Sequence, residues 1–202
     1  MKIHDHPIPR NAIRIGLPDT SQQTGYSCGP SCLQSICHYY GLGKEDEGEI
    51  VDDMKINPDY GADPDDIIRL AEKYGLKCKQ YQPMTMEKLK RVLQSRKPVM
   101  LMIQAWGIKR GEKDYRESYK GIWGEGHWVV AIGYDRDGIF FEDPSLQAVR
   151  GFLAYAELEE RWHDVVQKKK HQKKEHIEHY GLVLWKPGAK VSAYASRAER
   201  IA

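Results

Sequence analysis

The sequence predicts an α+β fold in which N-terminal helices pack on an antiparallel sheet. Three observations support this class. Most helical periodicities fall in the first half of the 202 residues, whereas apolar runs of strand length fall mainly in the second half. Between two of those runs, Asp137-Gly138 belongs to a strong turn signal, which predicts a hairpin of antiparallel strands.

The first helix is expected to begin at Gly29-Pro30, because proline suits the first helical turn, where its missing N–H would have no partner. Apolar residues then recur at helical spacing and define one face: Leu33, Ile36, Cys37 and Tyr40. Gly41 is a suitable C-cap. Further helices are expected over 63–75, 85–95 and 154–162.

Four apolar runs are expected to form strands: 98–104, 127–134, 138–142 and 180–185. The run 127–134 is apolar on both faces, which is typical of a central strand. The stretches 105–126 and 167–179 are the least regular parts of the chain between these elements. We therefore expect the helices to lie against a sheet whose centre is the 127–134 strand.

We expect one compact domain over residues 20–187, an N-terminal extension over 1–19 and a C-terminal tail over 188–202. With 30% charged residues and a net charge of +2, the chain as a whole needs no polyanionic partner, and no nucleic-acid partner is expected. No run of 18 apolar residues is present, so no membrane span is expected. The start lacks the apolar core of a secretory signal, which favours a cytoplasmic location.

Four cysteines are present, and Cys28, Cys32 and Cys37 fall within ten residues on the first predicted helix. This arrangement is a poor disulfide framework and favours free thiols. Cys37 and Cys78 are interpreted as packing residues. No second pair of close ligands accompanies Cys28 and Cys32, so we expect no metal and no cofactor. Cys32 is expected to pack as well, with a role as a resolving thiol as the alternative.

Cys28 differs from the other thiols because it ends a loop at the point where the first helix begins. Helix N-termini carry partial positive charge and unpaired N–H groups, which lower the pKa of a thiol and favour the reactive thiolate. The same N–H groups can bind a developing oxyanion. The position therefore suits a nucleophile, whereas a buried structural cysteine has no need of it.

His127 is the candidate base for this thiol. It begins the most apolar strand after the glycine-rich approach Gly124-Glu125-Gly126, where glycines let a substrate backbone come close. Asp143 ends the strand expected to pair with the His127 strand, so a carboxylate there can accept from the imidazole and fix its tautomer. Taken alone, Asp143 has an ordinary alternative as a turn residue before Pro144. The combination with Cys28 and His127 is far more specific.

Four blocks of the sequence resemble the C39 peptidase family in order and spacing. They are Gln22-x5-Cys28-Gly29-Pro30, Tyr39-Tyr40-Gly41, Gly126-His127-Trp128-Val129-Val130-Ala131-Ile132-Gly133-Tyr134 and Glu142-Asp143-Pro144-Ser145, within roughly residues 20–185. The sixteen-residue separation of His127 and Asp143 also fits. Members of this family are papain-like domains best known from bacteriocin-processing ABC transporters, where they cut leader peptides after a Gly-Gly pair.

The resemblance implies a papain-like cysteine protease fold, with Cys28 as nucleophile, His127 as base and Asp143 as orienter. It assigns Gln22, six residues before the cysteine, to the oxyanion hole, with Gln23 as the less favoured choice. A neutral amide donor suits this role because it stabilises an oxyanion without disturbing a thiolate–imidazolium pair.

The resemblance further implies a cysteine peptidase that acts on a peptide or protein substrate through an acyl-enzyme, with Gly-Gly-type leader sites as one candidate target. Two alternatives stay open: an acyltransferase or transpeptidase that uses the same thioester, and a peptide-binding module that no longer cuts. No ATP-binding domain or membrane span follows in the sequence, and Ser27 stands where family members often place an acidic residue. These departures indicate a stand-alone relative of the transporter domains.

Two irregular stretches carry further hypotheses. Segment 107–126 is long, charged and rich in glycine, and it ends beside His127, so we interpret it as a mobile flap that helps select substrate, with a solvated excursion as the alternative. The lysine-rich stretch 168–179 is interpreted as a solvated segment rather than a nucleic-acid or membrane contact. The aromatic candidates for contact with substrate are Trp106, Tyr115, Tyr119 and Trp123.

Overall fold

The computed structural model describes residues 12–106, 119–147, 149–168 and 173–189. Its described part has the predicted α+β architecture. The helices are α1 (Cys28–Tyr39), α2 (Glu47–Met54), α3 (Pro64–Lys73), α4 (Met86–Gln94) and α5 (Tyr155–Arg161), with a 3₁₀ turn at Tyr119–Gly121. The strands are β1 (Ile13–Arg14), β2 (Lys77–Tyr81), β3 (Val99–Gln104), β4 (Gly126–Tyr134), β5 (Gly138–Glu142), β6 (Gly151–Ala154), β7 (His163–Lys168), β8 (Lys173–Glu178) and β9 (Gly181–Trp185).

One antiparallel sheet has the strand order β2-β9-β3-β4-β5-β6, and β1 pairs with β4 outside this path. The central strand is β4, whose residues from His127 to Gly133 are all buried, in agreement with its apolar sequence. The predicted β4–β5 hairpin is present, and Val130 lies opposite Glu142 across it. This register brings the residue that follows β5 back toward the start of β4.

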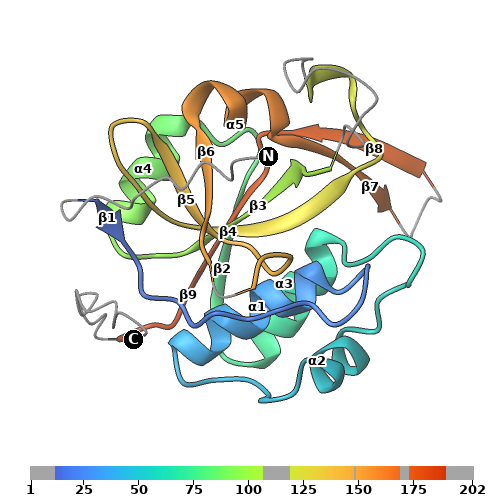
Figure 1. Cartoon of the computed structure of the whole chain (residues 1–202). Helices are drawn as coiled ribbons and strands as arrows, with labels where there is room; N and C mark the ends of the chain where they lie inside the picture. The colour runs from blue at the N-terminus through green and yellow to red at the C-terminus, as the bar shows by residue number, and fades with distance from the viewer. Residues whose placement is uncertain (1–11, 107–118, 148, 169–172, 190–202) are drawn as a thin grey trace.

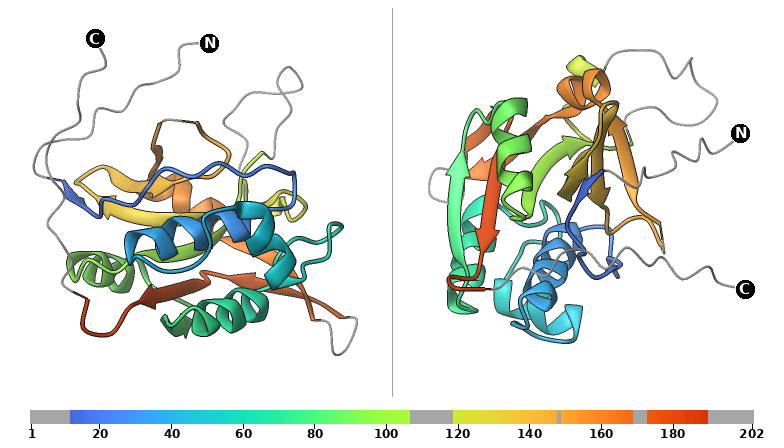
Figure 2. Two further views of the ribbon diagram at one scale, coloured as in Figure 1. Left: turned by 90° about the horizontal axis from the view of Figure 1, so that it is seen from below. Right: turned by 90° about the vertical axis from the view of Figure 1, so that its left-hand side faces the viewer.

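The helices form two groups around the sheet. In Figure 1, α1, α2 and α3 gather at the bottom of the view, and α4 and α5 lie at the top; the right-hand view of Figure 2 shows the same separation. No helix within the described ranges is both long enough and apolar enough to cross a bilayer.

Helix α1 is buried continuously from Cys28 to Cys37, and not only on the single face that its apolar spacing predicts. Its polar side chains find backbone partners in the segments that surround it. Ser35 Oγ donates to Pro18 O at 2.6 Å, and Gln34 Nε2 donates to a backbone carbonyl at 2.7 Å. Because such partners come from distant segments, the local pattern gave no sign of them.

The described part of the predicted N-terminal extension packs against the domain. Strand β1 pairs with β4, and Ile15 and Leu17 are buried in the core. Arg150 Nη2 donates to Leu17 O at 2.6 Å and so holds the segment that leads to α1. The predicted boundary at residue 19 therefore does not coincide with a break in packing.

The prediction that the stretch 167–179 is irregular is wrong for its described part. Strands β7 and β8 pair as an antiparallel ladder, from His163 opposite Glu178 to Lys168 opposite Lys173. The lysine-rich composition hid this ladder, since only Val166 and Ile177 supply fully buried apolar side chains to it. Residues 169–172 and the 107–118 part of the predicted flap, with Tyr115, lie outside the described residues.

Helix α2 and strand β2 were also missed, because both are short and polar. Asp46 caps α2 by accepting from Gly48 N at 2.6 Å, although only Glu47, Ile50 and Met54 of the helix are buried. Strand β2 is the last strand on its side of the sheet and pairs only with β9 among the described strands. Edge position and charge made its sequence resemble a loop.

Candidate active site

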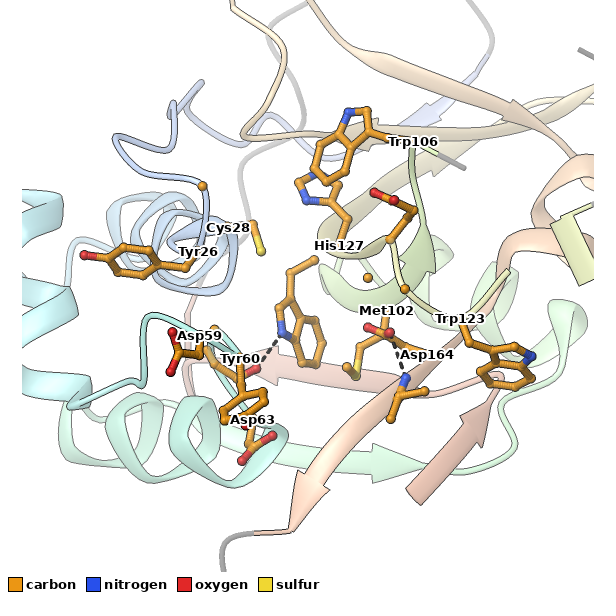
Figure 3. Close-up of a pocket in the computed structure, with 18 of the residues that line it drawn as sticks. Tyr26, Cys28, Asp59, Tyr60, Asp63, Met102, Trp106, Trp123, His127 and Asp164 are labelled. Atoms are coloured by element: carbon orange, nitrogen blue, oxygen red, sulfur yellow. Dashed lines mark hydrogen bonds between the residues drawn. The ribbon is translucent and has the colours of Figure 1, made fainter. Parts of the chain in front are cut away.

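Cys28 is the first residue of α1 and lines a pocket (Figure 3). The helix ladder begins only with Ser31, which donates its N–H at 3.0 Å, so the N–H of Cys28 lies outside the ladder. A Cβ added to Gly29 would lie 2.8 Å from Ala62 Cβ. Glycine therefore lets the loop 58–63 approach the helix start, where that loop forms one wall of the pocket.

His127 is the second residue of β4 and is almost completely buried. Its Nε2 lies 2.7 Å from Oδ1 of Asp143, the residue directly after β5. The same Oδ1 accepts from Ser145 N at 2.9 Å and from Ser145 Oγ at 2.7 Å. The hairpin register therefore brings imidazole and carboxylate together, and Ser145 fixes the carboxylate in turn.

The other ring nitrogen of His127, Nδ1, is buried and makes no geometric hydrogen bond within the described residues. Burial opposes a charged imidazolium, but the interactions with Asp143 and Cys28 outweigh it and raise the pKa of His127 to about 9. Figure 3 shows the Cys28 thiol and the imidazole at the same pocket. With Nε2 committed to the carboxylate, Nδ1 is the nitrogen left for exchange with the thiol.

Asp143 is held in its ionised form. Burial raises its pKa, but the hydrogen bond and the charge of His127 and the two bonds from Ser145 outweigh this and lower the pKa of Asp143 below its ordinary value. An ionised carboxylate keeps the proton on Nε2 of the neutral imidazole. The tautomer that places a lone pair on Nδ1 is thereby selected.

Trp106 covers the imidazole of His127. The two ring centroids lie 4.7 Å apart at an interplanar angle of 54°, and half of the Trp106 surface is exposed. Figure 3 shows the indole of Trp106 next to the imidazole of His127. Trp106 therefore limits solvent access to the His–Asp pair. Both Trp106 and Trp123 line the pocket, and their contact with substrate stays a prediction.

Gln22 lies in the loop before α1 and is tied to the turn after β5. Its backbone N donates to Pro144 O at 2.9 Å, and its side-chain Nε2 donates to Thr24 O at 2.8 Å. It does not line the pocket. An amide nitrogen carries two N–H groups, so one remains after the bond to Thr24. The assignment of Gln22 to an oxyanion hole stays a prediction.

Two buried carboxylates accept backbone N–H groups of this loop, and sequence reasoning identified neither. Glu142 Oε1 accepts from Thr20 N at 2.8 Å, and the same carboxylate pairs with Arg150. Because Glu142 directly precedes Asp143, one turn fixes both the partner of the imidazole and the loop before the thiol. The signal available in the sequence was a charged residue at the end of an apolar strand.

The second carboxylate is Glu47 of α2, which accepts from Gln23 N at 3.0 Å and is buried. Burial raises the pKa of Glu47, although its hydrogen bonds with Gln23 and Ser27 work in the opposite direction. Glu47 therefore supplies an acidic group beside Ser27 from a helix that the sequence analysis did not identify.

The pocket has a volume of about 410 Å³ and is bounded by three parts of the chain. They are the start of α1 with the 58–63 loop, the approach to β4 with Met102 of β3, and the β7–β8 hairpin. The lining is rich in carboxylates, from Asp59, Asp63, Glu125 and Asp164, whereas Lys174 of β8 brings a positive charge. The pocket therefore has carboxylates both in the 58–63 loop beside the start of α1 and on the side of β4 and β7.

Asp164 and Gln104 are site residues that sequence reasoning missed. Gln104 Nε2 donates to Asp164 Oδ1 and to His163 O, both at 3.1 Å, and Gln104 Oε1 accepts from Glu125 N at 3.0 Å. Gln104 thus joins β3, β7 and the approach to His127. A polar residue at the end of an otherwise apolar strand was the available signal, whereas nothing in the sequence marked Asp164.

The remaining predicted residues lie away from the pocket. Tyr119 is buried, and its Oη accepts from Arg161 Nη2 at 2.7 Å, so it does not face a peptide in the pocket. Burial raises the pKa of the other three thiols, to about 12 for Cys37 and Cys78 and well above the ordinary value for Cys32. These thiols pack in the fold, as expected for Cys37 and Cys78.

A protein-family model described as the Peptidase_C39 like family matches residues 14–170 of the chain. No curated protein matches the chain. Among solved structures, a C39-like peptidase from Bacillus anthracis is similar, with a TM-score of 0.63 and 16% identity, over 87% of this chain and 98% of that one.

Two transporter domains are also similar. The double glycine motif protease of an AMS/PCAT transporter, solved in complex with the leader peptide, has a TM-score of 0.58 and 17% identity, over 85% of this chain and 92% of that one. The peptidase domain of Streptococcus ComA, a bi-functional ABC transporter involved in a quorum sensing pathway, has a TM-score of 0.51 and 17% identity, over 83% and 96%. At these identities the likeness concerns the fold, which agrees with the predicted one.

Proposed function

The chain belongs to the peptidase C39-like family, and from this premise we propose that it is a cysteine peptidase with Cys28, His127 and Asp143 as its catalytic triad. One observation carries the proposal. The first residue of a buried helix is a cysteine, and it shares a pocket with an imidazole whose Nε2 lies 2.7 Å from a partly buried carboxylate. Nucleophilic catalysis by a thiol commonly uses this set of groups.

In the proposed acylation step, the Cys28 thiolate attacks the carbonyl carbon of a peptide bond, and the C=O electron pair moves onto oxygen. When the tetrahedral intermediate collapses, the C–N bond breaks and His127 gives its Nδ1 proton to the leaving amine. The pKa of His127, raised to about 9, keeps this proton available at neutral pH. The product is an acyl thioester on Cys28.

The negative charge on the carbonyl oxygen needs donors at the start of α1. The backbone N–H of Cys28 lies outside the helix ladder and points from the positive end of the helix dipole. Gln22 is proposed as the second donor through the amide N–H that is not bonded to Thr24. Its attachment to Pro144 and Thr24 keeps the side chain beside the loop that carries the thiol.

Deacylation follows the same path in reverse. His127, now neutral, takes a proton from water as the water oxygen attacks the thioester, and the C–S bond breaks to release the acid and the thiol. If an amine replaces water, the same thioester yields a new amide, which is the acyltransferase or transpeptidase alternative. A non-cleaving peptide-binding module is the other alternative, and the hydrogen-bonded His127–Asp143 pair argues against it.

A peptide or protein is the proposed substrate. The transporter protease solved with a leader peptide supports a peptide in the pocket of this fold, and Gly-Gly-type leader sites are kept as one candidate target. All four cysteines are free, which suits a reducing compartment, so the proposed location is the cytoplasm.

Thiol mapping tests the triad directly. Wild type and His127→Ala are treated briefly with iodoacetamide near pH 6, and labelling of each cysteine is measured by peptide mass spectrometry. Cys28 should be labelled fastest in wild type and should slow in His127→Ala, because the imidazolium stabilises the thiolate. Cys78, which is half-buried on an edge strand, is the internal control. Equal labelling of all four cysteines would rule out Cys28 as an activated nucleophile.

The products decide between the proposed reaction and its alternatives. Synthetic leader peptides that contain a Gly-Gly pair and mixed internally quenched peptides are incubated with the protein, with and without glycinamide, and the products are weighed. Free acids in both samples indicate a peptidase, whereas glycinamide adducts in place of acids indicate acyl transfer. Intact peptides that nevertheless bind would support the binding module and contradict the peptidase.

A further inference from the structure

Asp164 is a buried carboxylate in the pocket that the proposed mechanism does not use. It is the second residue of β7, exposes only 7% of its surface, and lines the same pocket as Cys28 and His127. Both hydrogen bonds that it accepts end on Oδ1, from Gln104 Nε2 at 3.1 Å and from Val165 N at 2.7 Å. Within the part of the chain that the structure describes, Oδ2 accepts none.

The backbone is adapted to this carboxylate at Gly126. A Cβ at that position would overlap both carboxylate oxygens of Asp164, so only glycine lets them lie against the residue that precedes His127. Gln104 fixes the orientation, because its amide is bonded on one side to Asp164 and on the other to Glu125 N. The second carboxylate oxygen is therefore presented from a rigid support.

The charge of Asp164 is only partly balanced. Burial raises the pKa of Asp164 and outweighs its hydrogen bonds with Val165 and Gln104 and the charge of His127, which lower it. Lys174 lines the same pocket, and no ion pair joins it to Asp164 among the described residues. Glu125 adds a further negative charge to the lining. A buried carboxylate whose charge is only partly balanced is costly, so a cation that enters the pocket gains the interaction.

Apolar side chains also line the pocket near Asp164. Figure 3 shows Met102 next to Asp164 and Trp123 on its far side, within the lining of the pocket. A group that reaches the carboxylate must therefore combine an aliphatic stem with a positive end. Lysine and arginine side chains have this composition.

On the basis of the proposed peptidase function, we propose that Asp164 forms a subsite that binds a lysine or arginine side chain of the peptide substrate. The charged end donates to Oδ2, and the bonds of Oδ1 to Gln104 and Val165 stay in place. The α-amino group of a short peptide carries the same charge, so the test must separate a side chain from a chain end.

N-acetylated tripeptidyl chloromethyl ketones are the probes, because they alkylate a catalytic thiol at a rate that depends on the occupied subsites. One position at a time carries lysine, norleucine or glutamate, and the other positions carry alanine. Norleucine has the stem of lysine without the ammonium. One further norleucine probe keeps a free α-amino group. Alkylation of Cys28 is followed in the full chain for wild type, Asp164→Asn and the control Asp52→Asn, an exposed aspartate of α2 outside the pocket.

The readout is the ratio of the lysine rate to the norleucine rate, which cancels any change in thiol reactivity. At one position, wild type and Asp52→Asn should prefer lysine by about tenfold or more, as expected for one charge-assisted hydrogen bond, and should react slowest with glutamate. Asp164→Asn should bring the ratio close to one. Asparagine keeps the Oδ1 acceptor for Gln104, so the support of the pocket is retained.

A second measurement needs no variant. In wild type, the ratio should fall as the pH is lowered from about 7 to about 5, because the pKa of Asp164 is raised to about 6 and its charge is lost below that value. Among titratable groups, His127 from β4 interacts with the charge of Asp164, and Glu125 before that strand and Lys174 from β8 line the same pocket, while β3 contributes the uncharged Gln104. Titration of His127 changes the rates of both probes and cancels in their ratio.

Equal lysine and norleucine rates at every position, with rapid labelling of Cys28, would overturn the subsite and leave the peptidase proposal standing. If the lysine preference survives in Asp164→Asn, the Asp164 subsite is wrong and another carboxylate binds the lysine side chain. If only the norleucine probe with a free α-amino group reacts faster, the subsite binds a peptide N-terminus and the proposed side-chain ligand is wrong. If neither the probes nor iodoacetamide label Cys28 faster than Cys78, the proposed function fails, and the subsite fails with it.

Discussion

Asp143 and Asp164 are two aspartates of the same site whose pKa values shift in opposite directions. Asp143 accepts three hydrogen bonds on Oδ1, one of them from His127, and its pKa is lowered. Asp164 accepts two hydrogen bonds, from Gln104 and from a backbone N–H, and burial raises its pKa to about 6. Burial raises both pKa values, so the opposite net shifts come from the groups that interact with each carboxylate.

The comparison separates two proposed tasks in one site. Asp143 pairs with the imidazolium of His127 inside the protein, and under the proposed function its charge orients that ring. Both carboxylates accept their hydrogen bonds on Oδ1, but the donors to Asp164 are neutral, so the proposed partner of its Oδ2 comes from the substrate. Under the two proposals, Asp143 therefore serves catalysis and Asp164 serves recognition.

Loss of the thiol is the largest change that this division predicts. Cys28→Ala should lower turnover of any cleaved peptide by about ten-thousandfold or more, because no other described group in the pocket can form the acyl-enzyme. Cys78→Ala removes a thiol outside the pocket and serves as the control. Residual turnover in Cys28→Ala above one per cent of wild type would place the chemistry elsewhere.

Asp143→Asn should lower kcat by about a thousandfold to ten-thousandfold, since an amide in place of the carboxylate favours the wrong imidazole tautomer. The fold should persist, because asparagine keeps an oxygen for Ser145. Steady-state kinetics and a circular dichroism melt measure the two effects, with Asp52→Asn as the control. If kcat stays at the wild-type level, another residue orients His127.

Gln22→Ala should lower kcat by about a hundredfold with little change in KM, as expected for one lost oxyanion donor. The neighbouring Gln23→Ala is the matched control, because Gln23 contributes a backbone N–H to Glu47 and its own side chain is exposed. A larger loss in Gln23→Ala than in Gln22→Ala would exchange the two assignments.

The pH profile gives the smallest effect and the sharpest test of the His127–Asp143 bond. The pKa of His127 is raised to about 9, so the imidazolium that protonates the leaving amine is present below that value and is lost above it. The alkaline limb of kcat/KM should therefore fall near pH 9. In Asp143→Asn the limb should move to lower pH, because the stabilising carboxylate is gone. If the alkaline limb of kcat/KM does not move in Asp143→Asn, it reports the titration of a group other than His127.

The sequence was sufficient for the parts of the site that depend on local geometry. A Gly-Pro pair after Cys28 marks a helix start, and an Asp-Gly turn fixes a hairpin whose register brings His127 and Asp143 together. These relations need only the positions of neighbouring residues. The resemblance to a family then supplied the roles of these residues.

The parts that escaped prediction depend on long-range packing. Asp164 enters the pocket because a lysine-rich hairpin docks beside β3, and no pattern in β7 announces that contact. Gln104 and Glu142 are polar ends of apolar strands whose partners lie up to 122 residues away. Side-chain chemistry indicates that such groups need partners, but only the fold identifies them.

The bond between Thr20 and Glu142 also has a consequence for the order in which the protein is made. The two residues are 122 positions apart, and contacts of such separation form only when most of the intervening chain is available. Because synthesis proceeds from the N-terminus, the segment with Cys28 leaves the ribosome long before Asp143 does. Under the proposed function, a nascent chain therefore carries Cys28 without the bonds that assemble the site, and peptide cleavage is expected only after β5 has emerged.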